Sequence, residues 1–569
     1  MKRRKFIQKL AAATGGTIAL NNVPVRVMAQ KSPFIRLAGQ SDNDRVTVII
    51  QLHGGHDGLN AIIPVEQYDL YYSRRANIAI PAKNSVRSYI PLDSTLPSAD
   101  QVGLHPDMIA AKNLYDRGRM TIVQGVSYPN NNGSHFRGRD IWHMGGGFDD
   151  YYSSGWVGRY LQQEYAPQTY PADFPNAEMQ DPLAIEIGSE VSLLFHQAGN
   201  IPTSISLPGN PQSFANLIDS LEGFDDQLID PRGKPPTALE NSPYGKELNW
   251  ILGLEDKTED YAGRLLEVYN NSSEPTVTYP ETYPFNAPSG SLRNGLTSQL
   301  QLVSRLIAGG AKTKVYLVRI GGFDTHADQV ESHDPTMGAH AALMYHLTSA
   351  MNAFQNDLKS RGIEDRVMSV TTSEFGRRIG SNGSFGTDHG KGGPLMIFGR
   401  HANPGVVGTN PDMTQNNVEM QHDYRQVFAN LLKDWMQVDE QVIKNDIFFG
   451  DFISGPKVDD IGNYEPLPLV QDQVTATEGF FGARFHMDDA FPNPAIDHTN
   501  ITFMINSPSY VRLHIIDQKG SMVKEVVNGW KAAGSYDTRV HLDGLKPGLY
   551  LYQIESNLLK TTKKLIIKK

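Results

Sequence analysis

The chain has 569 residues, enough for one large core and one smaller additional domain. Its 62 acidic residues outnumber its 52 basic ones, and the net charge of −10 argues against a nucleic-acid partner, because phosphate binding needs a basic surface. The absence of cysteine excludes disulfides, thiolate metal sites and a cysteine nucleophile. Beyond the N-terminal segment we find no run of about 18 apolar residues, so the sequence predicts no transmembrane helix.

The first 29 residues are predicted to be a signal peptide and not part of the fold. Arg3-Arg4-Lys5-Phe6-Ile7 resembles the twin-arginine export signal, and a weakly apolar stretch and a small-residue cleavage site ending at Ala29 follow. The resemblance implies the twin-arginine translocase as a partner, with passage through the periplasm. That route carries folded proteins, so a metal could be loaded before export. A frayed basic N-terminus is the alternative interpretation.

An α/β domain is predicted for residues 45–455. The strand candidates are 46–53, 119–125, 183–188, 313–320, 366–372 and 394–398. Most of them are β-branched runs without clean alternation, which is typical of strands covered on both faces. The helical patterns are 245–268, 290–309, 338–359 and 423–437. Their alternation with strands predicts a three-layer α/β sandwich with a mostly parallel sheet. Residues 200–244 and 270–290, rich in Pro, Ser, Asn and Gly, are predicted to be surface excursions.

Three of the predicted strands are followed by polar residues beside glycines. The run HGGHDGLN offers Asp57, GGFDTHADQ offers Asp324 and His326, and GTDHGKGG offers Asp388 and His389. Carboxylate and imidazole ligands suit a divalent ion, and the carboxyl ends of parallel strands meet at one edge of a sheet. The pattern therefore predicts one metal centre. Turn-capping carboxylates and a satisfied histidine are the alternative.

Two neighbours of these residues have an open role. Glu374 directly follows a predicted strand and is interpreted as a partner of Arg377 in preference to a metal ligand. His53 and His56 flank Asp57, and one of them could orient a ligand.

The run Asn132-Gly133-Ser134-His135 is the candidate catalytic segment. Ser134 would be the nucleophile for phosphoryl or sulfuryl transfer, His135 would donate to a substrate oxygen, and Arg137 or Arg139 would bind an oxyanion. An equally weighted alternative is that Ser134 caps a turn or helix. His135 and the arginines would then be ordinary surface or core partners.

The C-terminal part is predicted to be a linker, 456–480, followed by a small all-β sandwich, 481–569. Alternating apolar residues and turn glycines at Gly520 and Gly548 indicate the sandwich. Pro-Asn-Pro at 492–494, the run 517–520, Pro-Gly-Leu-Tyr at 547–550 and the basic tail resemble the C-terminal sorting domain of the Bacteroidetes type IX secretion system. The resemblance implies the type IX machinery as a partner and a cell-surface or extracellular destination. An accessory carbohydrate-binding sandwich is the alternative.

The series GGHDGLN, GSHFRGRDIW, GGFDTHADQ, SEFGRR and GTDHGKGG resembles the exported domain-of-unknown-function 1501 family over about residues 45–440. That family is distantly similar to the alkaline phosphatase and sulfatase superfamily. The resemblance implies that Asp57 is the first metal carboxylate and that Asp388 and His389 are the adjacent Asp-His pair. The remaining ligands implied by it are Asp324, His326 and a downstream histidine, for which His422 is the candidate. The superfamily usually spaces the Asp324–His326 pair more widely.

Together these features predict an exported, metal-dependent hydrolase with an alkaline-phosphatase-like core. Its substrate would be a phosphate or sulfate ester of a small molecule or glycan, and its cofactor one or two divalent ions, either zinc, magnesium, manganese or calcium. The alternative is a non-catalytic secreted or surface binding protein on the same scaffold, sorted by its C-terminal domain. The poorly matched last histidine favours that alternative.

Overall fold

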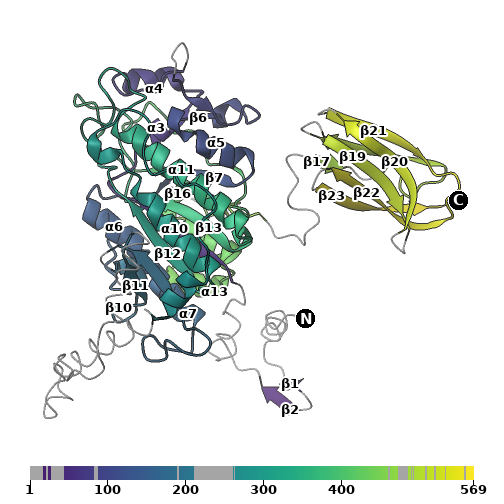
Figure 1. Cartoon of the computed structure of the whole chain (residues 1–569), viewed down its shortest axis with the longest axis horizontal. Helices are drawn as coiled ribbons and strands as arrows, with labels where there is room; N and C mark the ends of the chain where they lie inside the picture. Colours follow the sequence, from purple (N-terminus) through teal and green to yellow (C-terminus); the bar gives the residue numbers. More distant parts are fainter. Residues whose placement is uncertain are drawn as a thin grey trace. The chain divides into compact units, whose positions relative to one another are not determined.

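The computed structural model divides into two compact units, Met1–Val470 and Gln471–Lys569 (Figure 1). It describes residues 17–20, 23–26, 44–82, 87–188, 191–209, 261, 263–458, 462–471 and most of 485–568. Of the predicted signal peptide, only the short antiparallel pair β1 (Thr17–Leu20) and β2 (Val23–Arg26) lies within these residues.

The larger unit is built on a nine-stranded, mostly parallel sheet with the order β11-β8-β12-β3-β13-β14-β7-β15, to which β16 adds beside β7. Its strands are β3 (Val46–Leu52), β7 (Met120–Ser127), β8 (Ala184–Ile187), β11 (Ser204–Leu207), β12 (Val315–Ile320), β13 (Val367–Thr372), β14 (Gly393–Gly399), β15 (Gly405–Val407) and β16 (His422–Asp423). β14 is antiparallel to both of its neighbours, and the other pairs are parallel. All six predicted strands are present in this sheet.

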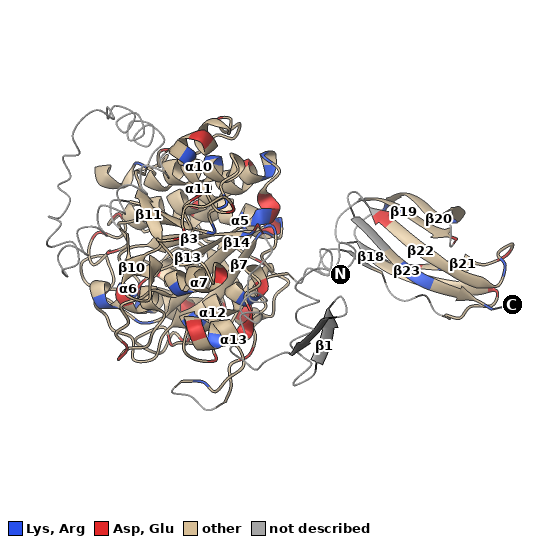
Figure 2. Ribbon diagram, turned by 90° about the horizontal axis from the view of Figure 1, so that it is seen from below, with Lys and Arg blue, Asp and Glu red and all other residues tan. Residues whose placement is uncertain are grey.

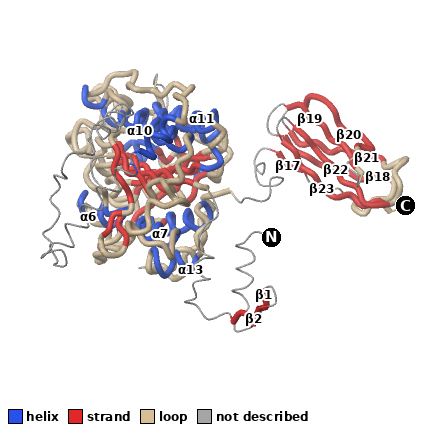
Figure 3. The backbone as a smooth tube through the Cα atoms, turned by 60° about the horizontal axis from the view of Figure 1, so that its bottom comes forward, coloured by secondary structure: helices blue, strands red, loops and turns tan. Residues whose placement is uncertain are grey.

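Helices cover both faces of the central sheet (Figure 3). One layer contains α5 (Ile109–Asp116), α10 (Gly295–Ala308) and α11 (Ala339–Ser360), and the other contains α6 (His135–Met144), α7 (Trp156–Glu164) and α12 (Tyr424–Asn430), continued by a π-helical turn, Leu431–Trp435. The side chains of β3 show why both layers are needed. Val48 and Ile50 belong to the core under α10 and α11, whereas Ile49 belongs to the core under α7 and α12. The predicted three-layer α/β arrangement is confirmed.

Smaller elements complete this unit. They are α3 (Gly58–Ala61), β4 (Ile62–Pro64), α4 (Tyr68–Arg74), β5 (Ile90–Pro91), β6 (Val102–Leu104), β9 (His196–Gln197), β10 (Ile201–Pro202) and α13 (Glu440–Val442). Acidic and basic residues are interspersed along its helices (Figure 2).

The structure differs from the predicted boundaries in two places. Residues 204–207, predicted to be part of a surface excursion, form the edge strand β11, because backbone pairing with β8 stabilises a run too short to stand out in the sequence. The predicted linker also begins too early: Tyr464, Leu467 and Leu469 are buried in the core of the larger unit. The helical pattern predicted for 245–268 lies mostly outside the described residues.

The smaller unit is an antiparallel β-sandwich, as predicted. One sheet contains β17 (Phe485–Met487), β18 (His498–Ile505) and β21 (Gly534–His541), and the other contains β19 (Ser509–Ile516), β20 (Met522–Lys531), β22 (Gly548–Ser556) and β23 (Leu559–Ile567). Alternate residues such as Val511, Leu513 and Ile515 point into one core shared with Ile501 and Val540 of the other sheet.

Candidate metal centre

Polar side chains gather at the carboxyl edge of the central sheet. Asp324 follows β12, His53 follows β3 and Glu374 follows β13, and these three strands are adjacent and parallel. His135 begins α6, which comes after β7. This is the edge at which open α/β sheets bind their ligands.

The centre of this edge holds three side chains that could bind a metal ion. One ligand atom from each of His135, Asp324 and His389 lies within 4.8 Å of the other two. These residues come from three separate segments, and the rings of His135 and His389 are 4.5 Å apart at their centroids. The structure thus brings together three of the residues singled out in the sequence, with His135 as a candidate ligand where the sequence predicted a catalytic donor.

Hydrogen bonds hold both imidazoles with the same nitrogen facing the cluster. His135 Nδ1 lies 2.8 Å from Glu374 Oε1, and His389 Nδ1 lies 2.7 Å from the carbonyl oxygen of Gly133. A carboxylate and a carbonyl both accept, so in the neutral form of each ring Nδ1 is the protonated nitrogen and Nε2 carries a lone pair. Both Nε2 atoms are buried and have no hydrogen-bond partner among the described residues, although carboxylate oxygens of Asp324 lie 3.5 Å from the first and 3.8 Å from the second. An ion would satisfy both, so the residues present fit a metal.

Asp324 supplies the carboxylate of the cluster and is half exposed. Its Oδ1 accepts from Arg377 Nη2 at 2.7 Å and lies 2.6 Å from His326 Nδ1, whereas its Oδ2 faces His135 Nε2 at 3.5 Å. Partial burial raises the pKa of Asp324, but the hydrogen bond and charge of Arg377 outweigh it and hold that pKa below its ordinary value. Burial also lowers the pKa of His389, so its ring is neutral and able to bind an ion at neutral pH.

Arg377 is the residue that fixes the geometry of this edge. It is fully buried and donates to the carbonyl oxygens of Gly55 and Thr387, both at 2.9 Å, as well as to Asp324. Gly54 permits the close approach of the first loop, because a Cβ there would lie 2.2 Å from the backbone nitrogen of Asp324. The glycines beside the acidic residues therefore serve packing between loops.

The candidate catalytic segment forms the start of α6. Ser134 is the N-cap, and its hydroxyl accepts the N–H of Arg137 at 3.4 Å, while the helix ends at Gly145 in the left-handed conformation. Ser134 is exposed, between Gly133 and His135 that both take part in the cluster. The Arg137 guanidinium donates to the carbonyls of Phe148 and Asp150 and stacks on Tyr151, so it holds the following loop to the helix.

Asp57, predicted to be the first metal carboxylate, is occupied elsewhere. It is 1% exposed, and its Oδ2 accepts from Arg75 Nη2 and Gln329 Nε2, both at 2.5 Å. Burial by itself raises the pKa of Asp57, but Arg75 and its other partners outweigh that effect and lower it. His56 and His340 lie beside this ion pair with their ring centroids 6.0 Å apart. The described contacts do not join Asp57 to the cluster.

Three other predicted ligands occupy different positions. His326 lies at the rim of the cluster, with its ring centroid 4.5 Å from that of His389. Asp388 is exposed and accepts from Asn382 Nδ2 at 3.2 Å. His422 lies on β16, paired with Val126, and its pKa is lowered by burial.

Glu374 is the member of this edge whose predicted partner is wrong, and His53, for which a role in orienting a ligand was left open, lies beside it. Glu374 accepts from His135 and from the backbone N–H of Gly54 at 2.9 Å, whereas Arg377 pairs with Asp324. His53 Nδ1 lies 4.0 Å from the same Glu374 oxygen. Both residues come within two positions of the end of a parallel strand, which places them at this edge, but their partners come from other segments.

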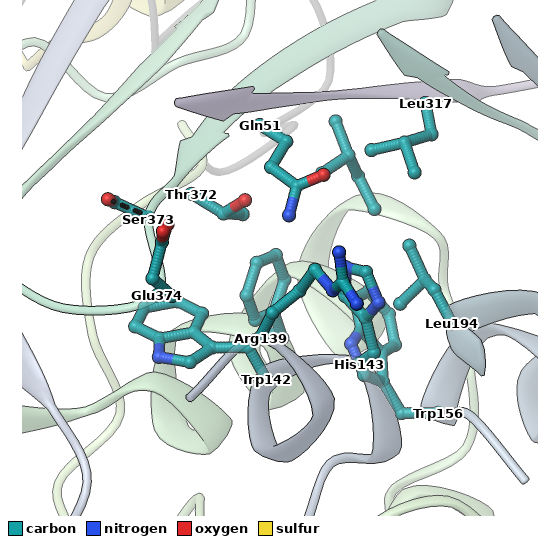
Figure 4. Close-up of a pocket in the computed structure, with 12 residues that line it drawn as sticks. Gln51, Arg139, Trp142, His143, Trp156, Leu194, Leu317, Thr372, Ser373 and Glu374 are labelled. Carbon is teal, nitrogen blue, oxygen red and sulfur yellow. Dashed lines mark hydrogen bonds between the residues drawn. The ribbon is translucent and has the colours of Figure 1, made fainter. Parts of the chain in front are cut away.

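A small pocket lies on the sheet side of Glu374 (Figure 4). It encloses about 340 Å³, part of it open to solvent, and Gln51 and Thr372 from the strands face Arg139 and His143 of α6 across it. The aromatic rings of Trp142 and Trp156 also line it.

Comparison with solved structures gives distant likenesses. A protein in the alkaline phosphatase superfamily from Vibrio parahaemolyticus is 10% identical, with 93% of this chain and 91% of that chain covered and a TM-score of 0.32. The PsFucS1 sulfatase from Pseudoalteromonas sp. is 10% identical, with 90% and 83% covered and a TM-score of 0.31. The alkaline phosphatase from the Antarctic bacterium TAB5 is 10% identical, with 64% and 94% covered and a TM-score of 0.24. At these TM-scores the likenesses carry no argument about the activity of this chain.

Two family models match parts of the sequence, and no curated protein matches it. The model described as a protein of unknown function (DUF1501) matches residues 266–447, a shorter stretch than the 45–440 suggested by the motifs. The model of the secretion system C-terminal sorting domain matches residues 489–568. Such a domain implies export through the type IX machinery to the cell surface or the medium, and no helix of the described residues is long and apolar enough to span a membrane. The chain thus carries a DUF1501 segment at 266–447, which contains Asp324 and His389, followed by a secretion sorting domain.

Proposed function

We propose that the larger unit is an exported, metal-dependent hydrolase acting on phosphate or sulfate esters. The observation that carries the proposal is the pair of buried, unpartnered Nε2 atoms of His135 and His389 beside the half-exposed carboxylate of Asp324. What distinguishes these two nitrogens is that they come from separate segments and converge beside one carboxylate, where an ion would give both a partner. The solvent-open carboxylate leaves room for a substrate.

His135, Asp324 and His389 would hold the ion, with His326 next to them at the rim. Three protein ligands with an open position are the pattern of catalytic sites, whereas structural zinc sites have all four positions filled by protein. The two imidazoles favour a borderline ion such as zinc over magnesium or calcium, which prefer oxygen ligands. Such an ion supplies Lewis-acid polarisation of a phosphoryl or sulfuryl oxygen.

Ser134 is the proposed nucleophile. Its hydroxyl is exposed at the N-terminus of α6, between Gly133, whose carbonyl orients His389, and His135. The hydroxyl accepts the Arg137 N–H, and among the described residues it donates to no group. The positive end of the helix dipole favours the negative charge that develops on this oxygen and on the ester. Arg137 remains a candidate for binding the ester oxyanion only if it leaves its present contacts.

The proposed route of export begins with the twin-arginine signal at residues 1–29, with transit through the periplasm. Because that route carries folded proteins, the ion could be bound before export. Arg3→Lys combined with Arg4→Lys should retain the chain in the cytoplasm, which fractionation and immunoblotting would measure.

A non-catalytic surface binding protein is the second candidate, and one contact favours it. The Arg377 guanidinium already pairs with Asp324, which weakens the attraction of this carboxylate for a cation. An ion held mainly by histidines at such a site could serve structure without catalysis.

Metal analysis and ester hydrolysis of the purified chain would separate the two candidates. The reference is the double variant His135→Ala/His389→Ala, and the matched control is Asp388→Asn, which changes an exposed carboxylate outside the cluster. We expect bound metal and hydrolysis of p-nitrophenyl phosphate or sulfate in the wild type and the control, and the loss of both in the double variant. A folded wild type that binds zinc without hydrolysing either ester would support the binding protein. A folded wild type without zinc affinity would overturn the proposal of a metal-dependent hydrolase.

A further inference from the structure

Glu374 is a buried carboxylate with no lysine or arginine beside it among the described residues. Its side chain is 0% exposed, and among the described residues no lysine or arginine nitrogen lies within 4.0 Å of its oxygens. Its Oε1 accepts from the backbone N–H of Gly54 at 2.9 Å and faces His135 Nδ1 at 2.8 Å. A buried carboxylate is costly unless a positive charge compensates it.

The two carboxylates of this edge therefore differ in their charge balance. Asp324 is paired with the Arg377 guanidinium at 2.7 Å, whereas the partners of Glu374 within ion-pair distance among the described residues are two imidazoles, His135 at 2.8 Å and His53 at 4.0 Å. The carboxylate accepts the Nδ1 proton, and the opposite nitrogen, Nε2, faces the cluster. A cation beyond Nε2 would balance Glu374 through the imidazole.

We propose that Glu374 is the positioning residue of the metal centre: it fixes the His135 tautomer that presents Nε2 to the ion and supplies the negative charge that strengthens this ligand. The inference rests on the proposed metal-dependent function. A carboxylate hydrogen-bonded to the far nitrogen of a ligating histidine raises the basicity of the ligand and fixes its ring. His389 is oriented differently, by the neutral carbonyl of Gly133, so only His135 gains from an added charge.

The local packing keeps Glu374 in place for this role. It lies two residues after the end of β13, and α6 approaches its backbone at Gly138, where a Cβ would lie 3.1 Å from the Glu374 carbonyl oxygen. The same helix carries His135, so the strand end and the helix start are held at a constant distance. The hydrogen bond between Glu374 and His135 is thus set by the packing of backbone against backbone.

The test compares zinc affinity of the full chain and its Glu374→Gln variant by chelator competition. We expect Glu374→Gln to bind zinc about 10- to 100-fold more weakly. The matched control is Glu186→Gln, because Glu186 is equally buried in the same sheet but pairs with Arg319 outside the cluster. The control should bind zinc with wild-type affinity.

The outcomes separate the inference from the function on which it rests. A folded wild type without zinc affinity would remove the proposed metal centre together with the inference. Wild-type zinc binding that Glu374→Gln leaves unchanged, while His135→Ala abolishes it, would overturn the role of Glu374 alone. If Glu374→Gln does not fold, a measurement on the wild-type chain still tests the inference. In the metal-free wild type labelled with ¹⁵N-histidine, His135 should carry its proton on Nδ1, and a proton on Nε2 would refute the inference.

Discussion

The prediction with the largest expected effect is the loss of stability on removing Asp57. Asp57→Ala takes away the only acidic partner that the described residues provide for Arg75, whose side chain is 0% exposed and whose Nε and Nη1 already lack partners. Removing one member of a buried ion pair leaves an uncompensated charge and costs about 3–5 kcal/mol. With an unfolding entropy of about 2.1 cal/mol/K per residue, a unit of roughly 430 residues should lose about 3 to 6 °C in Tm.

The assays are urea unfolding for the free energy and thermal unfolding for Tm, both followed by tryptophan fluorescence, with zinc affinity measured on the same samples. Asp57→Ala should lose stability and retain zinc affinity, because Asp57 contacts Arg75 and Gln329 and not the His135 cluster. The double variant Asp57→Leu/Arg75→Met should recover most of the loss, since apolar residues of similar volume often replace a buried pair without cost. If Asp57→Ala instead loses zinc binding while its unfolding free energy stays within about 0.5 kcal/mol of wild type, this reasoning is refuted and Asp57 is a metal ligand.

Three further predictions address the nucleophile, the loop packing and the pH dependence. Ser134→Asn should keep the helix cap and abolish ester hydrolysis, whereas Ser134→Ala should also lose about 1 kcal/mol in urea unfolding; wild-type hydrolysis by Ser134→Asn would exclude the hydroxyl as nucleophile. Gly54→Ala should lower the free energy of unfolding by about 1–3 kcal/mol, because a φ of 125° strains any residue with a side chain, and it should weaken zinc binding by displacing Asp324. Unchanged thermal unfolding and zinc affinity would contradict the close packing of Gly54 against the Asp324 backbone. Burial lowers the pKa of His56 to about 3 and of His340 to about 4, so below pH 6.5 the unfolded chain binds more protons than the folded one. The free energy of unfolding should therefore fall on acidification from about pH 6.5 to 4, by at most about 1.4 kcal/mol per pH unit for each histidine. Urea unfolding at pH 7, 6 and 5 measures this fall, and His340→Gln should make it less steep. A free energy that does not change with pH would count against neutral buried rings.

The elements of the fold could be predicted from the sequence because their signals are local. The predicted strand 46–53 and the helical pattern 338–359 carry their signals within a few residues, and the structure contains the strand at Val46–Leu52 and the helix at Ala339–Ser360. The strand β11 was missed because its four residues depend on pairing with β8. The sandwich at the C-terminus was identified from its alternation and turn glycines in the same way.

The candidate site could be predicted only in part, because local patterns do not determine partners. Asp57, Asp324 and Asp388 all follow predicted strands beside glycines, and nothing in these short runs distinguishes them. In the structure Asp57 forms a buried ion pair with Arg75, and Asp324 is surrounded by Arg377 and the two histidines of the cluster. Asp388 is exposed to solvent. The partner of each carboxylate is a long-range property.

The sequence by itself determined the three-layer α/β unit, the β-sandwich with its sorting motifs, and the edge of the sheet where polar residues gather, since strand ends and glycines are visible in single short segments. Only the tertiary structure decided that His135 and His389, 254 positions apart in the chain, face one carboxylate. It also decided that Glu374 is hydrogen-bonded to His135 and does not pair with Arg377, which pairs with Asp324. The physical reason is that burial assigns each charge the nearest compensating partner in space, and that partner comes from whichever loop the packing brings to the same edge.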